Sequence, residues 1–149
     1  MKKLSAILFL SFAMLNILPQ TTQAQCKRFT KKKCLSKLPP YTYNGQLNSA
    51  ILSQGDVADL KLTFYPEQKY RVFVCADEGL GNIEFKLINE DGNVIYDNEN
   101  TDYLPYWDFS TNEAIELTLR IIIPPAPSDA LTVKDGCVSI LVGFKDKDK

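Results

Sequence analysis

Two cysteines enclose the most basic stretch of the sequence, CKRFTKKKC, which runs from Cys26 to Cys34 and contains five Lys or Arg residues and no acid. Such a segment can bind an anion, for instance on a phosphate-rich lipid surface, or it can dock onto an acidic part of its own chain. Residues 39–149 carry nine Lys or Arg against eighteen Asp or Glu, a net charge of −9. This balance favours docking onto the acidic body and argues against a nucleic-acid partner.

The chain has four cysteines, Cys26, Cys34, Cys75 and Cys137. An even number in an exported chain indicates two disulfides, whereas zinc needs closely paired Cys or His ligands, and the chain has neither a CxxC motif nor any histidine. We predict the pair Cys75–Cys137, because one ends an expected strand, the other begins one, and both face away from the apolar side. Cys26 and Cys34 then pair by elimination. The segment between them is expected to loop back into a small ring, because a helix over 26–37 would hold the two cysteines about 12 Å apart, too far to bridge.

Without histidine, this chain alone cannot assemble a Ser–His–Asp or Cys–His pair, and we predict that the protein is not an enzyme. Paired acids can catalyse glycoside hydrolysis without histidine. A small carboxylate-dependent hydrolase is therefore a candidate function, ranked third after a protein-interaction module and a carbohydrate-binding module. The acids considered for this role are Asp77, Glu78, Asp97, Glu99, Asp102 and Asp108.

The segment DNENTD, Asp97 to Asp102, offers carboxylate and amide oxygens, which are the ligands that calcium prefers. Asp97, Glu99 and Asp102 are therefore the candidate calcium ligands. An EF-hand loop would need glycine at the sixth position, where this segment has Asp102. We favour a solvated loop and expect no cofactor.

The segment DYLPYWDF gathers four aromatic rings, and exposed rings flanked by polar groups can stack on sugars. The candidate ligand-binding residues are Tyr103, Tyr106 and Trp107. Trp107 and Phe109 are two residues apart, which favours burial of both in the core. Tyr103 and Tyr106 are then the expected exposed pair.

The N-terminus has the layout of a secretory signal peptide over residues 1–24: Lys2 and Lys3, a mostly apolar run over 4–18, and small residues before a cut after Ala24. The run is shorter than the about 20 residues of a membrane span, so we expect no transmembrane segment. The expected mature chain is exported to the periplasm or beyond, as one domain.

Period-two alternation dominates after Pro39–Pro40, with turn residues between the apolar runs, which is typical of antiparallel strands over a core. We predict an all-β, antiparallel two-sheet β-sandwich, jelly-roll-like, with about seven to eight strands. The expected organisation is a leader over 25–40, the sandwich over 41–145 and a disordered tail over 146–149. The residues expected to face the core are Leu60, Leu62, Phe64, Tyr70, Val72, Val74, Ile83, Phe85, Leu87, Ile115, Leu117, Leu119, Ile121, Ile123, Val138, Ile140, Val142 and Phe144.

The order GQLNSAILSQGDVADLKLTFYPEQKYRVFVC, then IEFKLINEDGNVIYDN, then YWDF and GCVSILVGF resembles a bacterial pre-peptidase C-terminal (PPC-like) domain over residues 45–144. The chain departs from the family pattern at Glu67, where the family usually has glycine. The resemblance implies a jelly-roll-like sandwich that serves secreted peptidases as a non-catalytic binding module, although no peptidase is attached here. The positions that carry it are Gly55–Asp56, Gln68, Tyr70 and Asp91–Gly92.

These observations predict an exported, non-catalytic β-sandwich that serves as an interaction or binding module, with a protein or a glycan as its partner. The alternative is a carbohydrate-binding module that uses its exposed aromatic rings on a glycan.

Overall fold

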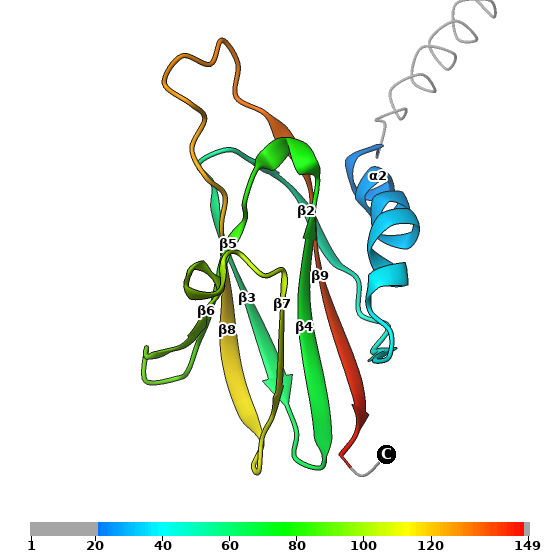
Figure 1. Ribbon diagram of the computed structural model, residues 1–149. Helices are drawn as coiled ribbons and strands as arrows, with labels where there is room; N and C mark the ends of the chain where they lie inside the picture. Colours follow the sequence, from blue (N-terminus) through cyan, green and yellow to red (C-terminus); the bar gives the residue numbers. More distant parts are fainter. Residues whose placement is uncertain (1–20, 148–149) are drawn as a thin grey trace, which may run out of the picture.

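The computed structural model describes residues 21–147, which form a two-layered β-sandwich with a helical segment on one side (Figure 1). Within this range, nine strands make two antiparallel sheets. The strands are β1 (Thr42–Tyr43), β2 (Asn48–Ser53), β3 (Val57–Phe64), β4 (Gln68–Ala76), β5 (Glu84–Ile88), β6 (Val94–Asp97), β7 (Tyr106–Ser110), β8 (Ile115–Ile122) and β9 (Asp135–Asp146). The helical segments are α2 (Thr21–Phe29), the π-helical turn η1 (Thr30–Cys34), and the 3₁₀ turns η2 (Leu35–Lys37), η3 (Glu78–Leu80) and η4 (Asn98–Thr101).

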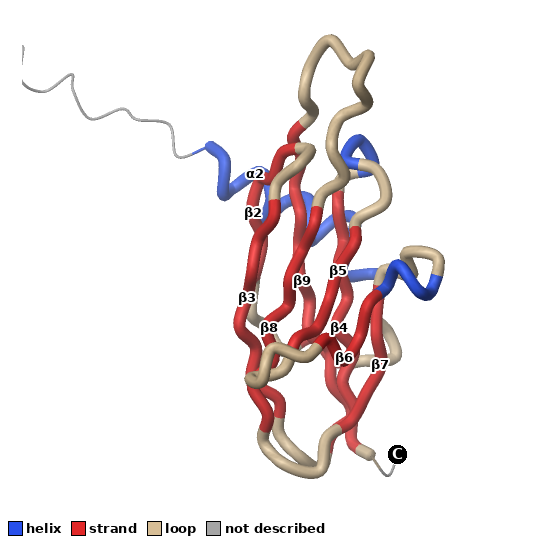
Figure 2. The backbone as a smooth tube through the Cα atoms, turned by 90° about the vertical axis from the view of Figure 1, so that its left-hand side faces the viewer, coloured by secondary structure: helices blue, strands red, loops and turns tan. Residues whose placement is uncertain are grey.

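Sheet A has the order β1–β9–β4–β7, and β2 also pairs with β9. Thr42 of β1 lies opposite Phe144, and Asn48 of β2 lies opposite Ile140, so β1 and β2 share one edge of β9. Sheet B has the order β3–β8–β5–β6. Figure 1 shows the two layers edge-on, and Figure 2 shows the molecule from the side of sheet B, with the loop between β8 and β9 projecting beyond one end. The predicted all-β, two-sheet antiparallel sandwich is confirmed.

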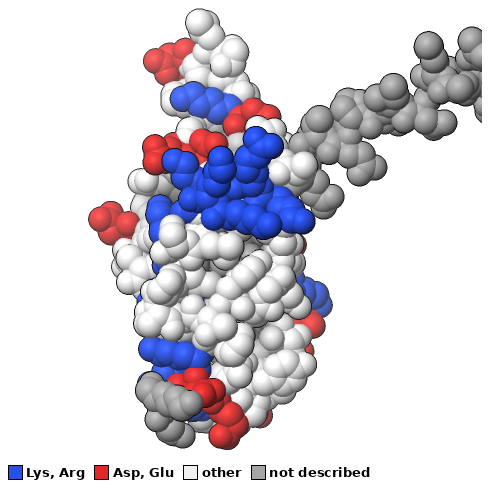
Figure 3. Space-filling model, turned by 90° about the vertical axis from the view of Figure 1, so that its right-hand side faces the viewer, with Lys and Arg blue, Asp and Glu red and all other residues white. Residues whose placement is uncertain are grey.

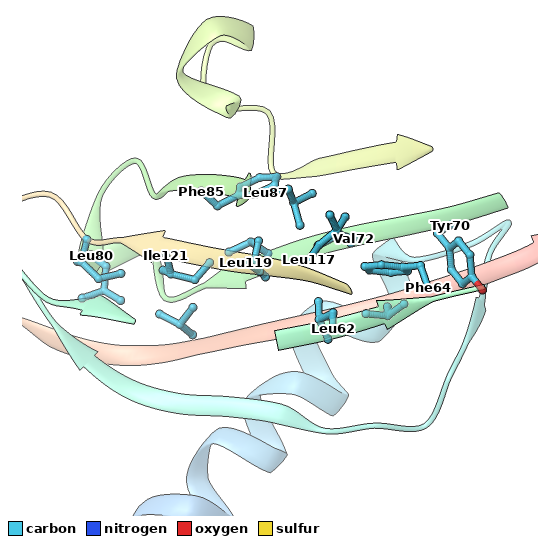
Figure 4. Close-up of a cluster of buried hydrophobic side chains, with 14 residues drawn as sticks. Leu62, Phe64, Tyr70, Val72, Leu80, Phe85, Leu87, Leu117, Leu119 and Ile121 are labelled. Atoms are coloured by element: carbon cyan, nitrogen blue, oxygen red, sulfur yellow. The ribbon is translucent and has the colours of Figure 1, made fainter. Parts of the chain in front are cut away.

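The main core lies between the sheets and follows from the alternation of the strands (Figure 4). Leu117, Leu119 and Ile121 of β8 point inward at two-residue spacing and are at most 2% exposed. They meet inward residues of the other strands, among them Val72 of β4 and Phe85 of β5. Each such side chain contributes about 1.5–3 kcal/mol to the free energy of folding. The predicted inward faces of these strands are confirmed.

The predicted turn at Asp91–Gly92 connects β5 and β6. Gly92 has a φ of 82°, which glycine adopts without the strain that a Cβ would bring. The amide of Gly92 donates to the carbonyl of Asn89, which closes the turn.

The apolar run of the expected signal peptide, residues 4–18, lies outside the described residues, and so do residues 148–149 of the expected tail. The expected cleavage site after Ala24 lies within α2. Over residues 21–147, no helix is long and apolar enough to cross a membrane.

The leader, residues 25–40, is helical rather than a closed ring. α2, η1 and η2 follow one another without a break and lie against the outer face of sheet A (Figure 1). α2 contacts β2 and β9, and η1 contacts β4.

The predicted disulfide pairing is wrong: Cys26 is bonded to Cys137 and Cys34 to Cys75, with Cα–Cα distances of 5.3 Å and 5.8 Å. Strand register is one reason, because Cys75 lies opposite Ser139, which places Cys137 two residues along β9. The helix is the other reason, because it holds the two leader cysteines about 12 Å apart and each one above a different sheet cysteine. Both sheet cysteines do lie on the outer face of sheet A, as their parity predicted.

Candidate functional site

One row of leader residues, spaced four apart along the chain, faces sheet A. Cys26, Thr30, Cys34 and Leu38 are at most 1% exposed. Four residues exceed one turn of an α-helix, so a regular helix would rotate this row away from the sheet. The π-helical turn η1 has more residues per turn and rotates the row back. The leader therefore keeps one continuous buried side.

A buried polar contact fixes the position of the row along β9. The hydroxyl of Thr30 donates to the carbonyl of Cys26 at 2.8 Å and shares a hydrogen bond with the hydroxyl of Ser139 at 2.6 Å. Ser139 is fully buried, so this hydrogen bond satisfies a group that would otherwise be costly to leave unpaired.

The outer face of sheet A is apolar where the leader covers it. Phe73 and Leu141 point outward and pack with Leu38 and Tyr41 in a second core cluster, which also includes the Cys34–Cys75 disulfide. The middle of sheet A is therefore buried on both faces. The leader is held by two disulfides and by its own apolar core.

Gly143 of β9 permits the close approach of the chain just after the helix. A Cβ at this position would lie 2.6 Å from the Cβ of Tyr41 and 3.1 Å from the Cδ1 of Leu38. Both contacts are shorter than non-bonded carbon atoms normally allow. Any larger residue here would push this part of the leader off the sheet.

The opposite side of the leader carries only cations among its charged residues, and we call it the basic face. Figure 3 shows it as a continuous patch of Lys and Arg on the side of the molecule that the helix covers. All six side chains are exposed. The residues of the basic face are Lys27, Arg28, Lys31, Lys32, Lys33 and Lys37.

The leader docks onto the sandwich, as expected, but its cations form no ion pair with the acidic body among the described residues. The ion pairs found within residues 21–147 involve Lys61, Arg71, Lys86 and Arg120, and none of them involves the basic face. The leader docks through cysteines and apolar side chains instead, because helical geometry turns its charged side away from the sheet. The positive charge of the basic face is therefore exposed to solvent.

Tyr106, an expected ligand residue, lies on the outer face of sheet A beside Arg71. The guanidinium of Arg71 lies 4.2 Å from the ring centre of Tyr106 and 4.6 Å from that of Tyr41. It also donates two hydrogen bonds to Asp108, at 2.7 Å and 2.6 Å. Burial and the neighbouring Asp108 carboxylate raise the pKa of the Tyr41 hydroxyl above its ordinary value. The ring of Tyr106 therefore already has a cationic partner within the protein, the guanidinium of Arg71.

Trp107 and Tyr103, the other two expected ligand residues, lie in different places. Trp107 packs against the main core and stacks between Tyr96 and Phe109, with ring centres 4.9 Å and 4.4 Å apart. Its expected packing in the core is therefore found. Tyr103 lines a pocket of about 230 Å³, whose polar lining includes Asp77, Glu78 and Asn82. The three aromatic residues do not form one binding platform.

The acidic segment has an internal cation. The Nζ atom of Lys86 lies 2.8 Å from Glu84 and 2.9 Å from Asp97, and these hydrogen bonds raise the pKa of Lys86 well above its ordinary value. Oxygen atoms of Glu84, Asp97 and Glu99 lie within 4.8 Å of one another, whereas Asp102 is not part of this group. Of the predicted calcium ligands, Asp97 and Glu99 are thus brought together, and Asp97 is paired with Lys86.

Several of the acids considered for catalysis have structural roles. Asp77 accepts a hydrogen bond from the amide of Gly79 at the start of η3, and Asp97 does the same for Glu99 at the start of η4. Asp108 is paired with Arg71. All four cysteines are in disulfides, so they offer no thiolate nucleophile.

No family model matches the chain, and no curated protein matches it significantly, so the resemblance to PPC-like domains stays a prediction. Among solved structures, the chain is similar to the crystal structure of Aeromonas hydrophila PliG, a periplasmic lysozyme inhibitor of g-type lysozyme. The identity is 12% and the TM-score is 0.47, over 67% of this chain and 85% of that chain. A likeness of this degree does not say which residues of this chain bind, or what they bind.

Proposed function

We propose that the protein is an exported, non-catalytic binding module that recognises an anionic partner through the basic face. The compartment is supported by the two disulfides, which persist in oxidising environments, and by the secretory layout of residues 1–24. The non-catalytic part of the proposal is supported by the structural use of the cysteines and by the lack of histidine in the chain, which remove the thiolate and imidazole groups of common catalytic pairs.

The observation that carries the proposal is the contrast between the two sides of the leader. One side is buried and covalently fixed at Cys26 and Cys34, while the other holds six exposed cations. Concentrating like charges on one short helix costs free energy through mutual repulsion. The two disulfides and the buried side hold the leader rigidly on the sheet. This rigidity lowers the entropic cost of binding, because few backbone bonds have to be ordered when a partner binds.

Salt dependence tests the proposal directly. Mature protein should bind immobilised inorganic polyphosphate in biolayer interferometry, with an affinity that falls steeply as the salt concentration rises. The variant Lys32→Gln/Lys33→Gln should bind much more weakly, since glutamine keeps helix propensity and removes charge. The control Lys69→Gln/Lys134→Gln makes the same change in net charge at exposed sites on the sandwich. Equal loss in both variants would refute recognition by the basic face.

A second candidate function is carbohydrate binding, and the observation that favours it is the position of Tyr103. Tyr103 lines the 230 Å³ pocket together with Asp77 and Glu78, and an aromatic residue beside acids is a combination that suits a pyranose face and sugar hydroxyls. A glycan array should then give hits that Tyr103→Ala abolishes. Trp107 is partly buried against the main core and does not line this pocket, so its fluorescence should stay unchanged on binding. An array without hits would leave only the basic face as a candidate.

A further inference from the structure

We propose that the anionic partner of the basic face is the headgroup surface of a negatively charged lipid bilayer, which the protein binds peripherally and without insertion. This inference rests on the proposed function and specifies its partner.

The chemistry of the cations is the first reason. Five of the six residues of the basic face are lysines, and only Arg28 carries a guanidinium. Arginine forms the planar, bidentate contacts that recognise one shaped carboxylate or phosphate, whereas lysine acts as a mobile point charge. A lysine-rich face suits many interchangeable phosphates, as lipid headgroups present them, rather than a single shaped site.

The lack of apolar anchors beside these cations is the second reason. Protein interfaces take most of their energy from buried aromatic and other large side chains at their centre. The apolar residues of the leader face sheet A: Leu38 is fully buried, and Phe29 and Leu35 pack against the second core cluster. The large hydrophobic residues that are exposed within 21–147 all belong to the sandwich and its loops.

The same arrangement determines the mode of binding. An interfacial helix normally inserts its apolar side into the lipid, but here that side is already used against the sheet. Contact with a bilayer is then limited to the headgroup level, where each Lys or Arg contributes by charge.

The one-sided placement of charge is the third reason. The cations span Lys27 to Lys37, about 15 Å along the helix, and they gather in one patch on one side of the molecule (Figure 3). A flat anionic surface can approach the molecule from this side. A flexible polyanion that wraps around the protein would be brought against the body, whose residues 39–149 carry a net charge of −9.

Vesicle co-sedimentation of the oxidised mature protein tests the inference. The protein should bind vesicles of phosphatidylcholine mixed with phosphatidylglycerol and should not bind phosphatidylcholine alone. Lys32→Gln/Lys33→Gln should weaken partitioning about 25-fold, at about fivefold for each charge. The control Lys69→Gln/Lys134→Gln should change it less than twofold. Added salt should release the bound protein, because no apolar side chain holds it.

The polyphosphate experiment separates the two proposals. Suppose that the protein binds polyphosphate through the basic face but does not bind anionic vesicles. This result would overturn the bilayer as partner and leave the proposed function standing. Binding to neither probe would overturn both. Vesicle binding that survives high salt would overturn the peripheral mode, because it would require inserted apolar groups.

Discussion

At the scale of single residues, Gly143 sets how closely the chain can approach sheet A after the helix. Its importance comes from space rather than from backbone freedom, because its φ is not in the left-handed region. Nothing in the local sequence GF marks this role. The contact depends on Tyr41, which lies about a hundred residues earlier in the chain and meets Gly143 only in the folded state.

Gly143→Ala should lower the free energy of unfolding by about 1–3 kcal/mol, because the new methyl group would overlap Tyr41 and Leu38. Urea unfolding of the oxidised protein measures the change. Gly79→Ala is the matched control, since its nearest neighbour would lie 3.6 Å from the added Cβ and its effect should stay within about 0.5 kcal/mol. Equal stability of the two variants would show that the approach at Gly143 is not tight.

Lys86 determines whether the acidic segment needs a metal ion. Its ammonium already compensates Glu84 and Asp97, and its raised pKa keeps it charged from neutral pH up to beyond the ordinary lysine range. These ion pairs therefore contribute their full stability at neutral pH, and they lose it progressively as the pH rises from the ordinary lysine pKa through the raised one.

We predict that removing calcium with a chelator leaves the melting temperature of the wild-type protein unchanged. Lys86→Ala should melt at a lower temperature and should gain a calcium-dependent rise, since three carboxylates would then lie together without a cation. Lys61→Ala removes a lysine that pairs with only one acid, Glu116, and should gain none. A calcium-dependent rise in the wild-type protein would contradict this role of Lys86.

At the scale of elements, the strand pattern predicted sheet A only in part. The alternation of KYRVFVC and CVSILVGF placed Val72, Val74 and Val142 in the core correctly. The same segments also have large apolar residues in the opposite phase, Phe73 and Leu141. An unbroken apolar run of this kind indicates a strand buried on both faces. The prediction used only one of the two alternating phases, so it gave sheet A no apolar outer face for the leader to cover.

The leader shows why the disulfide pairing was not predictable from spacing. Four cysteines allow three pairings, and parity placed Cys75 and Cys137 on the same face. The choice among pairings depends on the register of β4 against β9 and on a helix above them, and both are set by long-range contacts. The four-residue spacing of the buried row, beginning at Cys26 and ending at Leu38, was the local signal for that helix.

Non-reducing peptide mapping should find Cys26 linked to Cys137 and Cys34 linked to Cys75. In the chain-entropy model, their separations of 111 and 41 residues correspond to about 5 and about 4 kcal/mol of stabilisation. Replacing either pair by alanine should therefore lower stability by a similar amount in urea unfolding. A peptide that joins Cys26 to Cys34 would show that the leader is a ring and not a docked helix.

At the scale of the whole molecule, the alternation of the strands and the turn residues between them were enough to predict the sandwich. The sequence predicts how much charge each segment carries, but it does not predict which way the charged side chains of the leader point. The sequence shows six cations and no acid over residues 25–38, and a net charge of −9 over residues 39–149. Only the fold shows that the cations face solvent, because their orientation depends on which side of the helix is buried.

This asymmetry predicts anomalous chromatography. The mature chain from Gln25 has a net charge of −3, yet it should be retained on a cation exchanger at neutral pH and low salt, because the basic face can contact the resin alone. Lys32→Gln/Lys33→Gln should elute earlier than Lys69→Gln/Lys134→Gln, although the two variants have equal net charge. Identical elution would indicate that net charge, and not the patch, governs the interaction.

The disulfides also impose an order in time on the making of the molecule. A chain that crosses a membrane N-terminus first delivers Cys26 and Cys34 before either of their partners. Cys34 can reach its native partner once β4 has emerged, but Cys26 can do so only when β9, the last strand, arrives with Cys137. The leader is fixed at both of its cysteines only after nearly the whole chain has emerged, so a complete basic face belongs to a finished molecule.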